Sequence, residues 1–366
     1  MSTAEPVAAT GTGLPHRRFR TVRVADVQQL CDDAAAITFT VPDEYAAEFA
    51  FVPGQSVVIR RMIDGTEQRR TYSICSPAGD RPRIGVREVP GGAVSSWLVH
   101  QISPGDQVEV QPPSGNFTAD PARAGHHVLI AAGSGITPVL SIAASVLAHP
   151  ESRVTLLCGN RRATTVMFAD ELADLKDAYG ARMQLVHVLS REPRTADLLS
   201  GRLDRARVHA LLHHLVPLHS VDHFWLCGPL GMVTDAKTAL HELGVPGDRV
   251  HQELFFVEDA APAPVEHVDA AMAGPRSQVN IVLDGATSTL ALPRHSSILD
   301  AAQQSRSDLP FACKGGVCGT CRAKVTGGAV DMRRNYALEP AEVEAGFVLT
   351  CQSYPVTDAL TVDFDA

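Results

Sequence analysis

Four cysteines near the carboxyl end of the chain have a spacing that suits an iron–sulfur cluster. Cys313, Cys318 and Cys321 form a C-x4-C-x2-C sequence, and Cys351 follows at a distance. Two irons need four thiolates, and this spacing is typical of plant-type 2Fe-2S ligation. The alternatives are a structural zinc site or free thiols, but zinc sites favour paired short spacers. The sequence therefore predicts a 2Fe-2S centre.

The loop between these cysteines contains three glycines, Gly315, Gly316 and Gly319. We expect them to take positive φ, which lets backbone N–H groups turn toward the sulfurs without a Cβ clash. The remaining cysteines stand singly in apolar strands or turns, where we expect ordinary buried side chains; they are Cys31, Cys75, Cys158 and Cys227.

Two further segments could hold a phosphorylated cofactor. The run from Arg69 to Ser76, RRTYSICS, ends a predicted strand, and we expect its Arg, Tyr and Ser to project from one face. Gly91 to Leu98, GGAVSSWL, begins a predicted short helix whose free backbone N–H groups suit a pyrophosphate. A solvated strand face and a capped helix without a ligand are the alternative interpretations.

Glycines also follow two strands of a predicted parallel sheet. The segment from Gly133 to Pro138, GSGITP, comes after the apolar strand HHVLI, and Cys227-Gly228-Pro229 closes the strand HFWL. Open α/β sheets bind ligands at the carboxyl ends of their strands, so both segments are candidate nucleotide contacts. The first segment lacks the full G-x-G-x-x-G.

These motifs require several domains to position them, and 366 residues predict two or three. Short strands separated by turns predict an antiparallel barrel, and alternating strands and helices predict a doubly wound parallel sheet. An Ala- and Pro-rich linker precedes a third unit that starts with a hairpin and a helix. The expected limits are 1–16 for a disordered tail, 17–122 for the barrel, 123–258 for the α/β domain, 259–276 for the linker and 277–366 for the third domain.

Composition restricts the partners and the compartment. A net charge of −9 argues against nucleic acid, which requires a concentrated basic surface. No apolar run approaches the roughly 18 residues of a membrane span, so no membrane contact is expected. The first residues do not resemble a secretory signal, and clustered cysteines favour redox chemistry over disulfides, so the expected location is cytoplasmic.

Taken in order, these motifs resemble those of the ferredoxin-NADP reductase superfamily. They are Arg70-x-Tyr72-Ser73, Gly92-x-Val94-Ser95, the segment from Gly133 to Pro138, and Cys227-Gly228-Pro229. The carboxy-terminal cysteines narrow the resemblance to oxygenase reductases with FAD first, nucleotide second and cluster last. The resemblance implies an α+β ferredoxin-like (β-grasp) third domain.

The resemblance also implies roles for individual residues. Arg70 should meet the FAD pyrophosphate, Tyr72 should stack on the flavin, and Ser73 should lie near the flavin N5, with Cys227 near the point of hydride transfer. Ser73 and Cys227 are thus the catalytic candidates. The backbone contacts to the FAD pyrophosphate should come from Gly92, Val94 and Ser95, and those to the nicotinamide nucleotide from Gly133, Gly135, Thr137 and Gly228.

Within this family, three segments resemble the reductases of phenylacetyl-CoA epoxidases: residues 313–321, CKGGVCGTC, residues 335–340, NYALEP, and residues 346–352, GFVLTCQ. The expected function is electron transfer from NAD(P)H through FAD and a 2Fe-2S cluster to a diiron oxygenase in aerobic phenylacetate degradation. Reductases of ketosteroid 9α-hydroxylase, which residues 113–117 resemble, or of a ring-hydroxylating oxygenase are alternatives. A reductase for a small acceptor and a redox sensor also remain open.

The basic turn after the strand RVTLLCG bears on the choice of nucleotide. Arg161 lies where the adenosine ribose should sit, and an Arg there can pair with a 2′-phosphate. We therefore expect NADPH to be preferred over NADH, and a solvated basic turn is the alternative.

Overall fold

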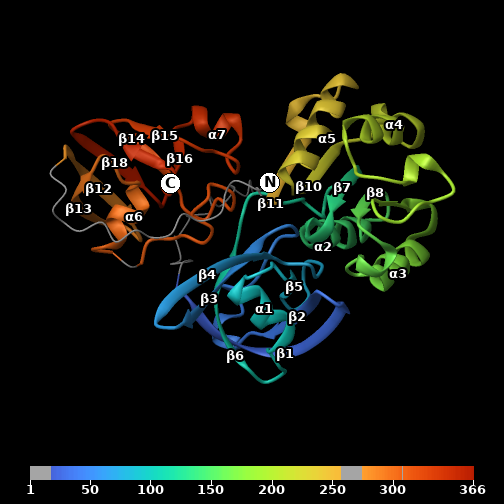
Figure 1. Cartoon of the computed structure of the whole chain (residues 1–366), viewed down its shortest axis with the longest axis horizontal. Helices are drawn as coiled ribbons and strands as arrows, with labels where there is room; N and C mark the ends of the chain where they lie inside the picture. The colour runs from blue at the N-terminus through green and yellow to red at the C-terminus, as the bar shows by residue number, and fades with distance from the viewer. Residues whose placement is uncertain (1–17, 257–273, 307) are drawn as a thin grey trace, which may run out of the picture.

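The computed structural model describes residues 18–256, 274–306 and 308–366, which form three domains, each built on its own sheet (Figure 1). We call them the barrel domain, the α/β domain and the cysteine domain, in chain order. The predicted tail and nearly all of the predicted linker lie outside the described residues. Within the described ranges, no helix is long and apolar enough to cross a membrane.

The barrel domain is a six-stranded antiparallel sheet in the order β4-β3-β6-β1-β2-β5. An isolated bridge between Ile74 and Ile84 joins the two edges, so the sheet closes on itself. Alternating strand residues such as Val57 and Ile59 fill the interior. The elements are β1 (Arg20–Cys31), β2 (Ala34–Thr40), β3 (Ser56–Ile63), β4 (Thr66–Ser73), β5 (Arg83–Arg87), α1 (Ala93–His100) and β6 (Gln107–Ser114).

The α/β domain is a five-stranded sheet in the order β11-β10-β7-β8-β9, and every strand pair in it is parallel. The strand order reverses between β7 and β10, which is where such sheets bind nucleotides. The elements are β7 (His126–Ala132), α2 (Ile136–Leu147), β8 (Arg153–Asn160), α3 (Ala169–Tyr179), β9 (Met183–Leu189), α4 (Arg205–Leu215), β10 (His223–Pro229), α5 (Leu230–Glu242) and β11 (Val250–Phe256).

The cysteine domain is a mixed sheet in the order β13-β12-β18-β14-β16, with α6 packed against it. The predicted hairpin is β12 and β13, and the predicted helix is α6. The elements are β12 (Arg276–Leu283), β13 (Ala286–Pro293), α6 (Ile298–Gln303), β14 (Arg322–Gly327), β15 (Val330–Met332), α7 (Pro340–Glu344), β16 (Phe347–Leu349), β17 (Ser353–Pro355) and β18 (Ala359–Asp363). The predicted fold class, an antiparallel barrel followed by a doubly wound and an α+β domain, is confirmed.

The barrel and α/β domains meet where β5 contacts the turn Gly133–Gly135, which leads into α2 (Figure 1). Arg83 forms a bidentate ion pair with Glu171, in which Nη1 donates to Oε2 and Nη2 donates to Oε1, each at 2.8 Å. The buried hydroxyl of Ser141 donates to the carbonyl of Ser76 at 2.7 Å. These contacts hold β5 and the segment after β4 against helices α3 and α2.

Candidate functional site

The barrel and α/β domains bring a hydroxyl and a half-buried carboxyl together at their junction. Ser73, the last residue of β4, donates from Oγ to Oε2 of Glu253 in β11 at 3.1 Å. Cys227 lies opposite Glu253 in the neighbouring strand β10. Both predicted catalytic residues, Ser73 and Cys227, are therefore next to the same carboxyl.

Glu253 was not identified from the sequence, although its environment gives it unusual chemistry. Burial raises the pKa of its carboxyl to about 7, and the hydrogen bond from Ser73 opposes that rise only partly. A group with a pKa near the working pH can exchange a proton during turnover. The available signal was an ionisable residue directly before the apolar end of β11, Leu-Phe-Phe.

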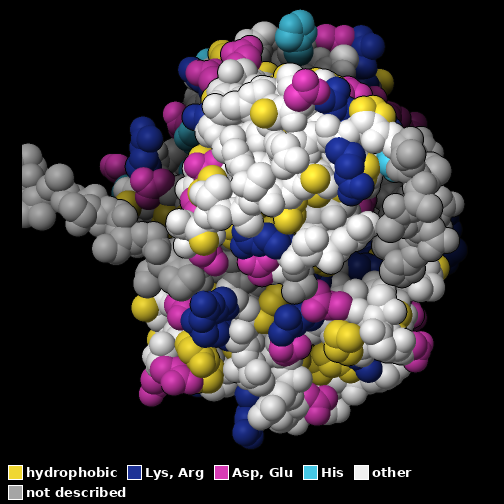
Figure 2. Space-filling model, turned by 90° about the vertical axis from the view of Figure 1, so that its left-hand side faces the viewer, with side chains coloured by type: hydrophobic (Ala, Val, Ile, Leu, Met, Phe, Trp, Pro, Cys, Tyr) yellow, Lys and Arg dark blue, Asp and Glu magenta, His cyan; other side chains and the backbone are white. Residues whose placement is uncertain are grey.

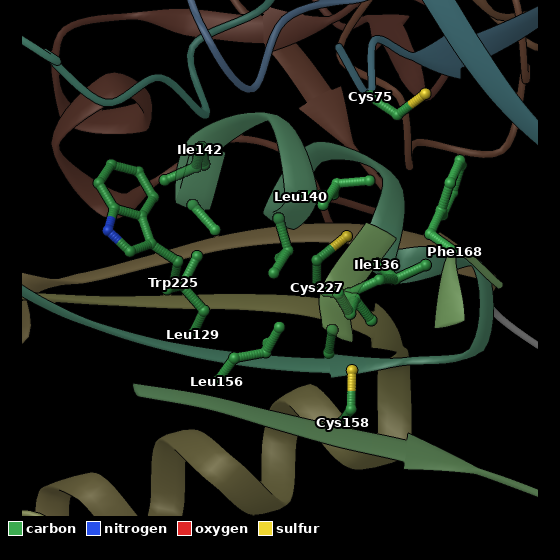
Figure 3. Close-up of a cluster of buried hydrophobic side chains, with 14 of the residues drawn as sticks. Cys75, Leu129, Ile136, Leu140, Ile142, Leu156, Cys158, Phe168, Trp225 and Cys227 are labelled. Carbon is green, nitrogen blue, oxygen red and sulfur yellow. The ribbon is translucent and has the colours of Figure 1, made fainter. Parts of the chain in front are cut away.

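The thiol of Cys227 lies in the apolar cluster between the parallel sheet and α2, close to Ile136 (Figure 3). Burial, aided by the nearby Glu253, raises the pKa of this thiol well above its usual value, so the thiol stays neutral. A Cβ atom on Gly135 would lie 2.1 Å from the carbonyl oxygen of Cys227. The turn after β7 can approach β10 this closely because residue 135 is a glycine.

The predicted flavin-binding residues of β4 divide between two faces of the strand. Arg70 and Tyr72 alternate and share a face, and Tyr72 packs on the barrel core. Ser73 directly follows Tyr72 and reaches the α/β domain instead. The expectation of one common face is therefore wrong for Ser73, because successive strand residues point to opposite sides.

The predicted pyrophosphate site forms the start of α1. Gly92 is the N-cap, and Ser95 receives the N–H of Val89 at 3.1 Å and donates to the carbonyl of Gly92 at 2.9 Å. Val94 and Ser95 are buried in the first turn. A Cβ atom on Gly92 would lie 2.6 Å from the Ser95 hydroxyl, so the turn is compact. The first backbone N–H groups of a helix have no partner within the helix. This geometry fits a pyrophosphate.

The predicted nucleotide-binding residues gather at the carboxyl edge of the parallel sheet. The short turn Gly133–Gly135 joins β7 to α2, and Thr137 donates to the carbonyl of Ser134 at 3.0 Å. Gly228 follows Cys227 in β10, beside that turn. Arg161 is exposed just after β8. Strand β7 lies between β8 and β10 in the sheet.

The four predicted cluster ligands come together as two pairs. The side chain of Cys313 interacts with that of Cys318, and the side chain of Cys321 interacts with that of Cys351. Among the described residues, no group of three or more His, Cys, Asp or Glu side chains surrounds one metal-ion position. Two pairs of thiols suit two irons better than one ion, so the donors fit a 2Fe-2S cluster.

Backbone donors also favour thiolate at this loop. The N–H groups of Gly315 and Cys318 each donate to Sγ of Cys313 at 3.4 Å. The hydrogen bond from Cys318 and these backbone donors lower the pKa of Cys313 to about 5. Such N–H···S contacts are the ones that tune an iron–sulfur centre.

Positive φ in the loop is confirmed for two of the three predicted glycines. Gly316 and Gly319 have φ of +79° and +66°. It is not confirmed for Gly315, and Lys314 adopts φ of +54°. Lys314 is held there because its Nζ binds Asp300 at 2.8 Å and its carbonyl accepts from Gln352 at 2.8 Å.

Of the four scattered cysteines, three are buried as expected and one is half-buried. Cys75, Cys158 and Cys227 lie in the apolar cluster shown in Figure 3. Cys31 is half-buried at the end of β1 and donates to Asp33 at 3.2 Å.

Three family models match successive parts of the chain. An oxidoreductase FAD-binding domain matches residues 21–119, an oxidoreductase NAD-binding domain matches residues 129–238, and a 2Fe-2S iron-sulfur cluster binding domain matches residues 281–356. These ranges contain the motifs assigned above to flavin, nucleotide and cluster.

Curated relatives match over nearly their full length. The chain is 41% identical over 353 residues to one of the subunits of 1,2-phenylacetyl-CoA epoxidase from Escherichia coli (strain K12), covering 95% of this chain and 98% of that protein. It is 36% identical to the ferredoxin reductase component of 3-ketosteroid-9-alpha-monooxygenase from Rhodococcus rhodochrous, covering 97% of this chain and all of that protein.

A solved structure shares the three-domain fold. Phthalate dioxygenase reductase, described as a modular structure for electron transfer from pyridine nucleotides to [2Fe-2S], aligns with a TM-score of 0.59 and 24% identity. The alignment covers 94% of this chain and 98% of that chain. At this identity the likeness concerns the fold alone.

Proposed function

Because the chain belongs to the family of oxygenase reductases that combine FAD-binding, NAD-binding and 2Fe-2S domains, we propose that it is the reductase component of a phenylacetyl-CoA epoxidase. It is an NAD(P)H-dependent flavin iron–sulfur oxidoreductase. The observation that carries the choice of oxygenase is the 41% identity over 98% of the Escherichia coli epoxidase protein. The reaction would then serve aerobic phenylacetate degradation in the cytoplasm.

When bound, FAD accepts a hydride and releases electrons one at a time to a 2Fe-2S centre, which a nicotinamide cannot do directly. We propose that Arg70, Tyr72 and the start of α1 hold the flavin. The turn Gly133–Gly135, together with Thr137, holds the nicotinamide nucleotide. Cys313, Cys318, Cys321 and Cys351 hold the cluster. We also propose the domain limits 17–122, 123–258 and 277–366, since each range contains one principal sheet. The first residue of β12, Arg276, lies just outside the third range.

The carboxyl of Glu253 has a role in proton balance. Oxidation of one NAD(P)H to NAD(P)+ yields two electrons, which leave one at a time, and releases one proton. The carboxyl of Glu253, with a pKa of about 7, can take up that proton at Oε2 through its hydrogen bond with Ser73. The neutral thiol of Cys227 adds no charge beside it.

The choice of nucleotide depends on Arg161. We propose that its guanidinium pairs with the 2′-phosphate of NADPH, because it is exposed beside the strand end where the adenosine ribose of a bound nucleotide would lie. NADH would lack that partner.

The proposal is tested by coupled oxidation with purified oxygenase components. The chain should support NADPH-dependent consumption of phenylacetyl-CoA by the oxygenase components of the phenylacetyl-CoA epoxidase. Its support of a ketosteroid 9α-hydroxylase oxygenase should be much weaker. The Cys351→Ser variant, lacking a cluster ligand, is the matched control. Coupling to the ketosteroid enzyme alone would contradict the assignment.

A further inference from the structure

A buried arginine joins the barrel domain to the cysteine domain. The side chain of Arg69, in β4, is only 6% exposed. Its Nη1 donates to the carbonyl of Leu309 at 3.3 Å, and its guanidinium carbon lies 4.2 Å from the centre of the Phe311 ring. These two contacts link segments that are 240 residues apart in the chain.

This contact lies between the two redox regions. Arg69 directly precedes Arg70 in the flavin-binding strand, and Phe311 stands two residues before the cluster ligand Cys313. We propose that Arg69 is a positioning residue that holds the cysteine loop against the flavin domain during electron transfer between them. This inference rests on the proposed function, in which the cluster receives its electrons from the flavin.

The chemistry of the contact suits a domain that docks and departs. Burial lowers the pKa of Arg69, and Glu67 offsets this effect by pairing with its Nε at 2.6 Å. The Phe311 ring and the Leu309 carbonyl also offset the cost of burying the Arg69 charge, but only while the cysteine domain is docked. When that domain leaves, water can replace them around the guanidinium. An apolar side chain at this position would make neither the hydrogen bond to Leu309 nor the cation–π contact with Phe311.

Other contacts of the cysteine domain orient it without linking β4 to the cysteine loop. Asn116 donates to Glu342 at 3.2 Å, and Val317 and Tyr336 pack against the core of the α/β domain. The face shown in Figure 2, which is the left-hand side of Figure 1, has basic and acidic side chains interspersed over its described part. The buried Arg69 contact is therefore the one that couples flavin strand and cluster loop most directly.

Arg60 provides a matched control for the experiment. It pairs with Arg69 across β3 and β4, forms ion pairs with Glu67 and Glu109, and lies over the same Phe19 ring that Arg69 approaches. Its described contacts are all within the barrel domain.

The test compares Arg69→Met and Arg60→Met in single turnovers with NADPH under anaerobic conditions, after iron and flavin content are shown to be normal. Flavin reduction should be unchanged in both variants. Cluster reduction should slow about tenfold in Arg69→Met, because loss of a desolvated cation–π contact lowers the docked population by that order. It should be unchanged in Arg60→Met. Wild-type cluster reduction in Arg69→Met would overturn the inference, whereas no cluster reduction in the wild type would instead refute the proposed function.

A second measurement does not depend on turnover. Amide hydrogen exchange of residues 308–317 in the loaded protein should be faster in Arg69→Met than in the wild type or Arg60→Met. The Phe311→Leu variant should slow cluster reduction similarly, and the double variant should slow it no more than either single variant. If Arg69→Met does not fold, the Phe311→Leu variant alone tests the inference. Unchanged exchange, or fully additive slowing, would show that the two side chains do not act as a pair.

Discussion

Replacing Glu253 by Gln should stabilise the protein at alkaline pH and not at acid pH. Glutamine has nearly the same shape and can still accept the hydrogen bond from Ser73, but it carries no charge. The carboxyl has a pKa of about 7 in the folded protein against 4.5 for the free group. The folded state therefore binds this proton more tightly than the unfolded state does.

The pH window follows from these two values. Below about pH 4.5 the carboxyl is protonated in both states and its burial carries no ionisation cost. As the pH rises toward 7, the unfolded state loses the proton first, so wild-type stability falls relative to the variant. Above pH 7 the cost is constant at about 3 kcal/mol, taking about 1.4 kcal/mol for each pKa unit.

The assay is urea unfolding of FAD-loaded wild type and Glu253→Gln at pH 5 and pH 8.5, followed by tryptophan fluorescence, since Trp225 lies in β10 beside β11. The stability advantage of the variant should widen by about 2 to 3 kcal/mol between the two pH values. The exposed Glu151→Gln, in the same domain, should show no such widening. A constant or narrowing difference for Glu253→Gln would show that the pKa of the Glu253 carboxyl is not raised in the folded protein.

Three further substitutions test other parts of the site. Cys351→Ser should lose iron and keep FAD, as measured by iron and flavin content per chain. Wild-type iron content in this variant would contradict the assignment of Cys351 as a cluster ligand. Gly135→Ala should destabilise the α/β domain by about 1 to 3 kcal/mol in urea unfolding, because the new Cβ would meet the carbonyl of Cys227 at 2.1 Å; an unchanged midpoint would contradict this. Arg161→Ala should lower the ratio of kcat/KM for NADPH to that for NADH about tenfold, and an unchanged ratio would exclude the phosphate contact.

The parts of the molecule that the sequence predicts are those with local signals. The cysteine spacing singles out the proposed cluster ligands because Cys313, Cys318 and Cys321 occupy a single loop. The barrel and the parallel sheet follow from strand patterns and turns over short windows. The turn after β7 is recognisable because Gly135 is required where the chain passes close to β10.

The remaining features depend on how distant segments pack. Ser73 and Glu253 are 180 residues apart, and their hydrogen bond exists only because the barrel and α/β domains dock. The same holds for Arg69 and Leu309. The packing of Val317 of the cysteine domain on the α/β core likewise joins segments that are far apart in the chain. The positive φ of Lys314 also comes from tertiary hydrogen bonds and not from its residue type.

The proposed function requires electrons to pass from NADPH through FAD to the 2Fe-2S cluster within one chain. This electron path can be followed in an anaerobic titration with NADPH, monitored by absorption and by electron paramagnetic resonance. Each chain should take up about three electrons, two on the flavin and one on the cluster, with the cluster signal appearing in full. Uptake that stops at about two electrons, with the flavin bleached and the cluster still oxidised, would contradict this electron path.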